Sequence, residues 1–540
     1  MRRRKRFAAN MRGRELLFVA VALLLLSGFP ALWAAASAQG KSAALSKKEI
    51  LAYLLAGESS PALADKIRAR GIDFVPGAAE EATFRSAGAD EDVLKAISAA
   101  RSSDTGSANP GSDAAIYQEL SDCATARQAG EWDKAETACN AAASLAPQDA
   151  LVMTAAGYLL ARRAKWDAAL PILARALDLD GESAITHADA SITLLGKGNV
   201  DAALTEANAA ATLEPRLTVA YVALGDALDH KGALDDAVAA YRQAIAVEPN
   251  SAEAHAHLAG ALVEKGDIAG ATAEYRRAIT ARPADASLHY ALGLALRSKS
   301  DFAGAAEEFR AAVSRDPSNP AYHRALAGAL EDAGNLEAAS EEYRAALQLD
   351  PKNAEAHSGL GEVLFRKTDY PGAAAEYRQA VQLNGNDTLA HYNLGRSLLE
   401  SGDAQGAVAE FQQALLLDPR YAMAHYELGL ALLKLKDPDT AVAEIRRAVE
   451  LRPGDAKLRN NLGSVLLRYK DDAPGAEESF RAALRLNPNY ALAHFDLGLA
   501  LEQEGDNSGA LGELKRATEL EPRNADYRSA YDQLTGKKSQ

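Results

Sequence analysis

The chain has 540 residues, with 59 basic against 74 acidic side chains and therefore a formal net charge of −15. A chain this acidic is poorly suited to holding a phosphate backbone, because that requires clustered lysine and arginine. Nucleic acid is therefore not expected as a partner.

The first 38 residues are typical of an export signal. A basic start that includes Arg2 and Lys5 precedes an apolar run over residues 16–26, and Ala36-Ser37-Ala38 offers small residues for cleavage before Gln39. The alternative is an uncleaved signal anchor, because residues 16–36 approach the roughly 20 residues needed to span a bilayer. Both alternatives export the rest of the chain, to the periplasm or the extracytoplasmic face of the membrane. Contact with the membrane is expected only for the uncleaved form.

Residues 39–102 predict a small separate helical module. Ser46 followed by Glu49 has the spacing of a capping box, and Ser60-Pro61 opens a second helix that ends near Gly71. Two further amphipathic stretches lie at 79–86 and 90–100. Residues 103–115 are rich in Ser, Gly, Asn and Pro and predict a flexible linker, so the module is expected to move relative to the remainder of the chain.

That remainder repeats itself. Helix-ending residues recur every 34 residues, with one interval of 35: Pro147, Gly181, Pro215, Pro249, Pro283, Pro317, Pro351, Gly385, Pro419, Pro453, Pro488 and Pro522. A period of this size indicates stacked units, each of which buries its apolar face against its neighbours.

One unit, residues 388–421, shows what the period contains. Leu394 and Leu398 have helical spacing, and a break at Ser401-Gly402-Asp403 separates them from a second helical run that Pro419 ends. Two helices of this length joined by about three residues form a helical hairpin.

These residues resemble the tetratricopeptide repeat. The small residue at position 8 of the unit is Gly395, the small residue at 20 is Ala407, the aromatic at 24 is Phe411, the alanine at 27 is Ala414, and the proline at 32 is Pro419. The same register recurs in twelve units over residues 116–524, which start at Ile116, Ala150, Ala184, Thr218, Ala252, Ala286, Pro320, Ala354, Thr388, Ala422, Ala456 and Ala491. The resemblance implies an all-α, right-handed superhelical solenoid of about twelve hairpins. Residues 525–540 would add a C-terminal capping helix and a short tail.

Eight histidines share the fourth position of their repeats: His187, His255, His289, His323, His357, His391, His425 and His494. Equivalent side chains on stacked helices lie about 8–10 Å apart at the helix axes. A zinc ion needs ligands that converge at about 2.0–2.1 Å. The histidines are therefore expected to be structural, and no metal or other cofactor is predicted.

Cys123 and Cys139 occupy inward-facing positions on the two helices of the first repeat. They are either two buried thiols or a disulfide, which an exported protein favours. Neither is expected to be catalytic.

In the tetratricopeptide family, positions 2, 5, 9, 12 and 13 of the first helix line a concave groove. Carried onto this chain, the candidate partner-binding residues are Tyr290, Leu294, Leu389, Tyr392, Arg396, Met423, Tyr426, Leu430, Lys457, Asn460, Leu492, Phe495 and Leu499. Such an apolar and aromatic stripe with polar residues has the composition of a binding hot spot. The alternative is that these groups pack between neighbouring first helices.

The sequence shows no pair of acids placed as general acid and base and no phosphate-binding glycine loop, so no catalytic residue and no enzyme activity are predicted. The expected function is a non-catalytic scaffold or adaptor of the bacterial cell envelope that binds a peptide or protein in the groove. The alternatives are a self-assembling structural solenoid, which would be a homo-oligomer, and the regulatory subunit of an envelope enzyme.

Overall fold

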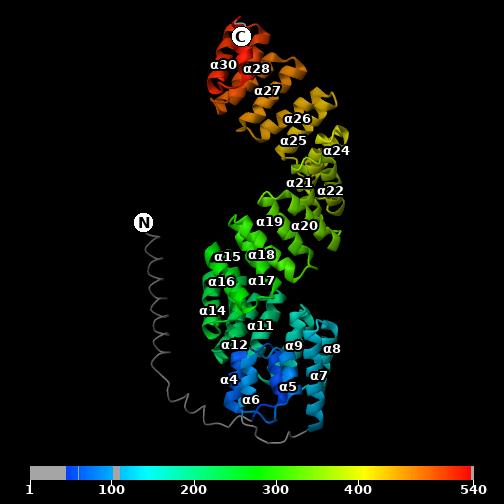
Figure 1. The fold of residues 1–540 in the computed structure, drawn as a ribbon, viewed down its shortest axis with the longest axis vertical. Coiled ribbons are helices and arrows are strands. Elements are labelled where there is room, and N and C mark those ends of the chain that lie inside the picture. The colour runs from blue at the N-terminus through cyan, green and yellow to red at the C-terminus, as the bar shows by residue number, and fades with distance from the viewer. Residues whose placement is uncertain (1–43, 59, 101–109, 537–540) are drawn as a thin grey trace, which may run out of the picture. The chain divides into compact units, whose positions relative to one another are not determined.

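The computed structural model describes residues 44–58, 60–100 and 110–536. The predicted signal segment at 1–38 lies outside the described residues, as do most of the predicted linker and the last four residues of the tail. The described residues form 29 helices, and their single extended pairing is an isolated parallel bridge between Leu45 and Ile72 (Figure 1). The prediction of an all-helical protein is confirmed. None of these helices has both the length and the apolar content needed to cross a membrane.

The chain divides into two compact units, residues 1–281 and 282–540. In the first unit, four short helices precede five hairpins. The helices are α3 (Lys47–Leu55), α4 (Ser60–Arg70), α5 (Ala78–Ala87), α6 (Glu91–Ala99), α7 (Pro110–Gln128), α8 (Trp132–Leu145), α9 (Ala150–Arg162), α10 (Trp166–Leu179), α11 (Ala184–Gly196), α12 (Val200–Leu213), α13 (Thr218–His230), α14 (Leu234–Val247), α15 (Ala252–Glu264) and α16 (Ile268–Ala281).

The second unit contains seven hairpins and one final helix. They are α17 (Ala286–Ser298), α18 (Phe302–Arg315), α19 (Pro320–Asp332), α20 (Leu336–Leu349), α21 (Ala354–Arg366), α22 (Tyr370–Leu383), α23 (Thr388–Glu400), α24 (Ala404–Leu417), α25 (Ala422–Lys434), α26 (Pro438–Leu451), α27 (Ala456–Lys470), α28 (Ala473–Leu486), α29 (Ala491–Glu504), α30 (Asn507–Leu520) and α31 (Ala525–Leu534). The ring of Tyr527 in α31 lies 4.8 Å from that of Phe495 in α29, so α31 packs against the last repeat.

The first helices of repeats 2–12 begin at the residues that the 34-residue register gives. The first repeat differs, because α7 begins at Pro110, inside the segment predicted as linker, and not at Ile116. Proline suits the first turn of a helix, where its missing N–H would have no intrahelical partner. The serine and glycine content of this segment therefore hid a helix start.

Each hairpin turn contains one residue with a left-handed backbone. Glycine occupies this position in seven repeats, as at Gly402 with φ 94°. Thr368 and Lys436 occupy the same position with φ 63° and 62°, where a Cβ costs about 1–2 kcal/mol. An acidic or amide side chain then caps most of the second helices; Asp403, for example, accepts a hydrogen bond from Gly406 N at 2.8 Å.

The two helices of a repeat cross where the register places its small residues. A Cβ on Gly395 would lie 2.7 Å from Cε1 of the Phe411 ring, which is fully buried. Gly293 has the same relation to Phe309, and Gly463 to Phe480. The aromatic ring therefore occupies the space that a side chain at position 8 would need.

The structure joins Cys123 of α7 to Cys139 of α8 as a disulfide, with Cα atoms 5.4 Å apart. Both side chains are buried in the core of the first unit. The bridge therefore ties together the two helices of the first repeat.

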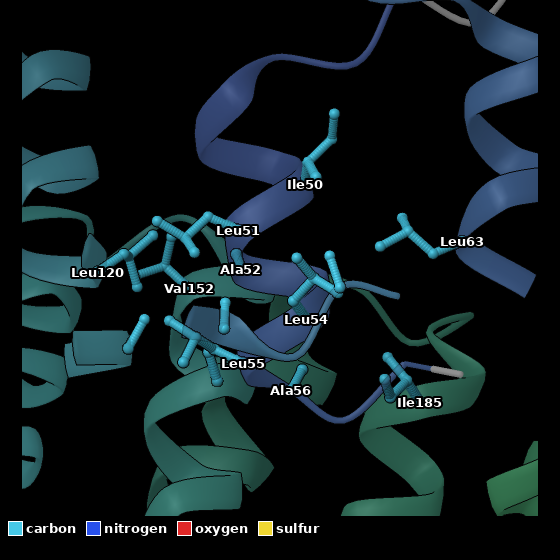
Figure 2. Packing of buried hydrophobic residues seen from close by; sticks show 14 of the residues in the cluster. Ile50, Leu51, Ala52, Leu54, Leu55, Ala56, Leu63, Leu120, Val152 and Ile185 are labelled. Carbon is cyan, nitrogen blue, oxygen red and sulfur yellow. The ribbon is translucent and has the colours of Figure 1, made fainter. Parts of the chain in front are cut away.

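The sequence predicts that the small helical module is separate from the repeats, but in the structure the two are packed together. Leu51, Leu54 and Leu55 of α3 share one buried cluster with Leu120 of α7 and Val152 of α9 (Figure 2). The apolar face of α3 is broad enough to need a covering surface, and the first helices of the early repeats provide it. Within the first unit the module is therefore docked on the repeats.

Candidate functional site

First helices of neighbouring repeats lie side by side on one face of the second unit, the face that the family resemblance predicts to be concave. The pairs α19 with α21, α21 with α23, α23 with α25, and α27 with α29 are in contact. Positions 2 and 9 on such helices point away from the second helices, which cover the other side. We call this surface, on α17 to α29, the open groove.

Three leucines predicted as groove residues are exposed on this surface. Leu389 is 57% exposed, Leu294 43% and Leu492 38%. Lys457 is also exposed, while Met423, Tyr426, Leu430, Phe495 and Leu499 are half-buried. Large apolar side chains that stay in water cost free energy, and a partner that covers them recovers about 25 cal/mol for each Å².

Two predicted groove residues are buried and serve the packing of the repeats. Asn460 is 1% exposed and donates a hydrogen bond from Nδ2 to Asp496 Oδ2 at 2.8 Å, which links α27 to α29. Tyr392 is buried beside Phe411, at 5.9 Å between ring centroids. The prediction that Asn460 faces a ligand is therefore not met, because its amide donates to a carboxylate 36 residues along the chain, beyond the reach of the repeat pattern.

Arg396 is held by aromatic rings of its neighbours. Its guanidinium carbon lies 4.4 Å from the centroid of Phe365 and 5.7 Å from that of Tyr392. Such cation–π contacts fix a long side chain in place without neutralising its charge. Arg396 therefore presents a preorganised positive charge in the open groove.

A pocket of about 530 Å³ lies between the turns that precede α27 and α29. It is lined by Arg452, Gly454, Asp455, Ala456, Lys457, Asn487 and Tyr490. Asp455 already accepts hydrogen bonds from the backbone of Lys457 and Leu458, at 2.9 and 3.1 Å. Arg452 and Lys457 are thus the polar groups of this pocket that are best suited to bind an acidic group of a ligand.

Tyr426 reaches across the groove to the next repeat. Its hydroxyl oxygen accepts a hydrogen bond from Asn461 Nδ2 at 2.9 Å. Burial raises the pKa of Tyr426 above its ordinary value of 10.0. The ring edge remains half-exposed, so Tyr426 both joins two repeats and forms part of the groove floor.

The histidines of position 4 bind carboxylates of their own repeats. Nδ1 of His425, for example, lies 2.6 Å from Glu444 Oε2, and its Nε2 lies 3.2 Å from the carbonyl oxygen of Pro419 in the preceding repeat. The same carboxylate contact recurs in the other seven repeats concerned. The glutamate at position 23 was missed in the sequence, because it lies 19 residues away on the other helix of the hairpin.

His289 is the exception, and a neighbour explains it. Its Nδ1 lies 2.7 Å from Glu308 Oε2, but its Nε2 has no hydrogen-bond partner among the described residues. The carbonyl oxygen of Pro283, which would be the equivalent acceptor, takes a hydrogen bond from Arg315 Nε at 2.6 Å. In the described part of the chain, no three His, Cys, Asp or Glu side chains group as a metal site would require.

Three solved structures illustrate what the chain is similar to. YrrB, described as a TPR protein with an unusual peptide-binding site, is 26% identical over 35% of this chain and 96% of its own, with a TM-score of 0.32. Yeast Tom70 is 16% identical over 80% of this chain and 96% of its own, with a TM-score of 0.32. PilF of Pseudomonas aeruginosa is 21% identical over 42% of this chain and 100% of its own, with a TM-score of 0.34.

No curated protein matches the chain significantly. Family models do match it. Models described as tetratricopeptide repeat or TPR repeat match residues 225–266, 259–299, 286–319, 329–368, 392–456 and 464–525. These matches fall on hairpins of both units. Together with the hairpin architecture, they show that the chain is a tetratricopeptide-repeat protein, built as a scaffold for protein–protein interaction.

Proposed function

We propose that this chain is a non-catalytic scaffold or adaptor of the bacterial cell envelope, and that it binds a peptide or protein segment in the open groove. The observation that carries the proposal is the exposure of Leu294, Leu389 and Leu492 on the face formed by the first helices. The regular repeats explain the leucines that are buried, but they give no reason for these three to face water.

The charges of the open groove suggest the chemistry of the ligand. Arg396 on α23, Lys457 on α27 and Arg452 in the turn before α27 offer positive charge. A matching ligand presents apolar side chains together with a carboxylate, from Asp, Glu or a chain end. Arginine and aromatic groups of this kind are enriched at binding hot spots.

Export is part of the proposal. It is supported by the basic start, the apolar run and the small residues of 1–38, together with a cysteine pair placed within bonding distance. Disulfides persist in oxidising compartments. Cell fractionation and N-terminal sequencing test this point: a mature chain that begins at Gln39 supports a cleaved signal, and an intact cytoplasmic chain contradicts export.

A crosslinking experiment tests the groove. A photo-reactive residue at Leu389 is compared with one at Leu416 of α24, a leucine that is 75% exposed outside the set of predicted groove positions. In the native host, one dominant foreign protein captured from Leu389 and not from Leu416 is the expected result. Equal capture from both positions would show that the groove has no special role. Crosslinks only between copies of this chain would favour the self-assembling solenoid.

A further inference from the structure

The concave face of the early repeats differs from the open groove, because the chain itself covers it. Each of repeats 1–4 contributes residues at groove positions 2, 5 or 9 to the cluster that contains the module. They include Leu120, Leu151, Ile185, Ala188, Ile192 and Val219. Leu120 is fully buried and Ile185 nearly so, whereas Leu389, at position 2 of repeat 9, faces water.

Helix α3 lies against these positions as a bound amphipathic helix would. Leu51 lies beside Leu120 and Val152 (Figure 2), and Leu54, Leu55 and Ile185 belong to the same buried cluster. Anchors three and four residues apart are the pattern by which helices bind grooves of other proteins. At Gly57, just after α3, an added Cβ would lie 2.9 Å from Cζ of Tyr158, at position 9 of repeat 2.

Ion pairs hold the module at both ends of this interface. Lys48 of α3 lies 2.9 Å from Asp149 and 3.3 Å from Asp113, both of which belong to the repeat region. Lys66 of α4 lies 3.0 Å from Glu214, in the turn after α12 of repeat 3. These contacts fix how α3 and α4 are seated.

The interface also buries acids that it does not satisfy. Asp189 of α11 is 1% exposed, and neither of its carboxylate oxygens has a hydrogen-bond partner among the described residues. Glu58, just after α3, is buried with its Oε2 equally without a partner in that part of the chain. A buried polar group without a partner costs about 1–3 kcal/mol, and more when charged. Docking of the module therefore carries a penalty that an optimised core would avoid.

The charges around these two acids fix the direction of the pH effect. Burial, followed by the nearby Glu58, raises the pKa of Asp189 well above its ordinary value. Burial raises the pKa of Glu58 as well, with Lys66 opposing the increase and Glu214 adding to it. Tyr53 of α3 lies near Glu58, and Tyr158 of α9 lies near Asp189 with Arg127, Arg162 and Glu253 around it. An acid whose pKa is higher in the docked state than in the released state stabilises docking fully at a pH below its pKa in the released state. This stabilisation is lost as the pH rises through the pKa of the docked state.

We propose that the module of residues 44–100 is a reversible plug: it binds in cis to the concave face of repeats 1–4, and it keeps closed a second protein-binding site that takes an amphipathic helix with the leucine spacing of α3. Release exposes the leucine, isoleucine and valine side chains of that face together with the acids Asp113, Asp149 and Asp189. The site thus prefers a helix that carries a lysine one turn before its leucines, as Lys48 precedes Leu51. This inference concerns the first unit and stands apart from ligand binding in the open groove.

Cleavage of the full chain between module and repeats tests the plug. A protease site placed within residues 103–108 is cut, and the products are separated by size-exclusion chromatography at about pH 5 and about pH 8. The expected result is that the module elutes with the repeats at the lower pH. At the higher pH the dissociation constant of module and repeats should be at least tenfold larger, since a difference of one pKa unit corresponds to a tenfold change in an equilibrium constant. A module that stays bound equally at both pH values would overturn the proposal and leave a purely structural core.

Three variants sharpen the result. Asp189→Asn removes the charge but keeps the shape, and it should hold the module at both pH values. Lys48→Glu should release the module, while Lys95→Glu, the same charge change on an exposed residue of α6, should not. Release by both lysine variants, or no change with Asp189→Asn, contradicts the proposed contacts.

Light scattering of the uncut chain separates the cis arrangement from exchange between copies. A monomer is expected, and it should bind the dye bis-ANS more strongly when it carries Lys48→Glu, because the apolar face is then open. A dimer that dissociates with Lys48→Glu would show that modules are exchanged in trans and would refute the plug in cis.

Discussion

Nδ1 of His425 on α25 lies 2.6 Å from Oε2 of Glu444 on α26, and its Nε2 faces the carbonyl oxygen of Pro419. One side chain thus links the two helices of its repeat and the end of the repeat before. A charge-assisted contact of this kind, largely shielded from water, stabilises more than a surface ion pair. Because it recurs at the same positions, the histidine row is a set of links between helices and not a row of metal ligands.

Glu444→Gln should lower the free energy of unfolding of the second unit by about 1.5 kcal/mol, since it weakens a hydrogen bond to a charged carboxylate. Urea denaturation followed by circular dichroism measures the change. Glu450→Gln is the matched control, because Glu450 pairs with Arg447 on the surface, where such pairs contribute about 0–1 kcal/mol. Equal effects of the two variants would contradict the special role of the histidine contact, and stoichiometric zinc lost with His425→Gln would restore the metal interpretation.

Thr368→Gly should stabilise the second unit by about 1 kcal/mol. Thr368 has φ 63°, a conformation that is unfavourable for a β-branched residue and free of strain for glycine. Gly402→Ala, at the equivalent position of the next repeat, should have the opposite effect. The midpoints of urea denaturation give both changes, and a Thr368→Gly protein that is less stable than the parent would refute the argument.

The first unit should lose stability between about pH 6.5 and about pH 9 through His257. Burial alone would lower the pKa of His257, but the Asp226 carboxylate, 2.7 Å from Nδ1, raises it to about 9. A group whose pKa is higher in the folded than in the unfolded state stabilises the fold. This stabilisation is fully present at a pH below the pKa of the unfolded state, and it is lost as the pH rises through the pKa of the folded state.

Thermal denaturation of the parent and His257→Gln proteins at several pH values measures this contribution. The difference in melting temperature between the two proteins should shrink as the pH rises. His230→Gln is a suitable control, because Nδ1 of His230 contacts only a backbone carbonyl, that of Asp226. A difference that stays constant with pH would rule out the protonated His257.

The double variant Cys123→Ser with Cys139→Ser should destabilise the first repeat by about 3 kcal/mol, because the bridge restricts a 16-residue separation in the unfolded chain. Hydrogen exchange of α7 and α8 is the direct measurement. Exchange in α29 and α30 should be unaffected, and it provides the internal control. Unchanged protection of α7 and α8 would show that packing alone holds this repeat.

Leu389→Asp should weaken capture of a partner by the open groove while leaving the fold intact, because Leu389 is exposed. Tyr392→Ala, three residues on, is expected instead to cost about 3–5 kcal/mol, since it removes a buried ring. Pull-down yields and circular dichroism on both variants separate the two effects. Retained capture with Leu389→Asp would remove the main support for the groove.

The sequence by itself determined the repeat. Its register fixed where the first helices of repeats 2–12 begin, because helix-ending prolines, capping aspartates and the small residue opposite Phe411 are local or lie within one hairpin. These features act over a few residues or across one pair of helices, so they can be recognised from residue spacing in the sequence.

The tertiary structure decided which surfaces are open. Nothing in the spacing of α3 showed that its leucines cover the face of repeats 1–4, because its docking depends on residues about a hundred or more positions away, as between Lys48 and Asp149. The register likewise places Asn460 in the groove, but its amide donates to the carboxylate of Asp496 in the next repeat. Whether a residue at a given repeat position is exposed or buried depends on contacts with residues far along the chain. The 34-residue period fixes where that residue lies in its helix, but it does not specify which residues pack against it.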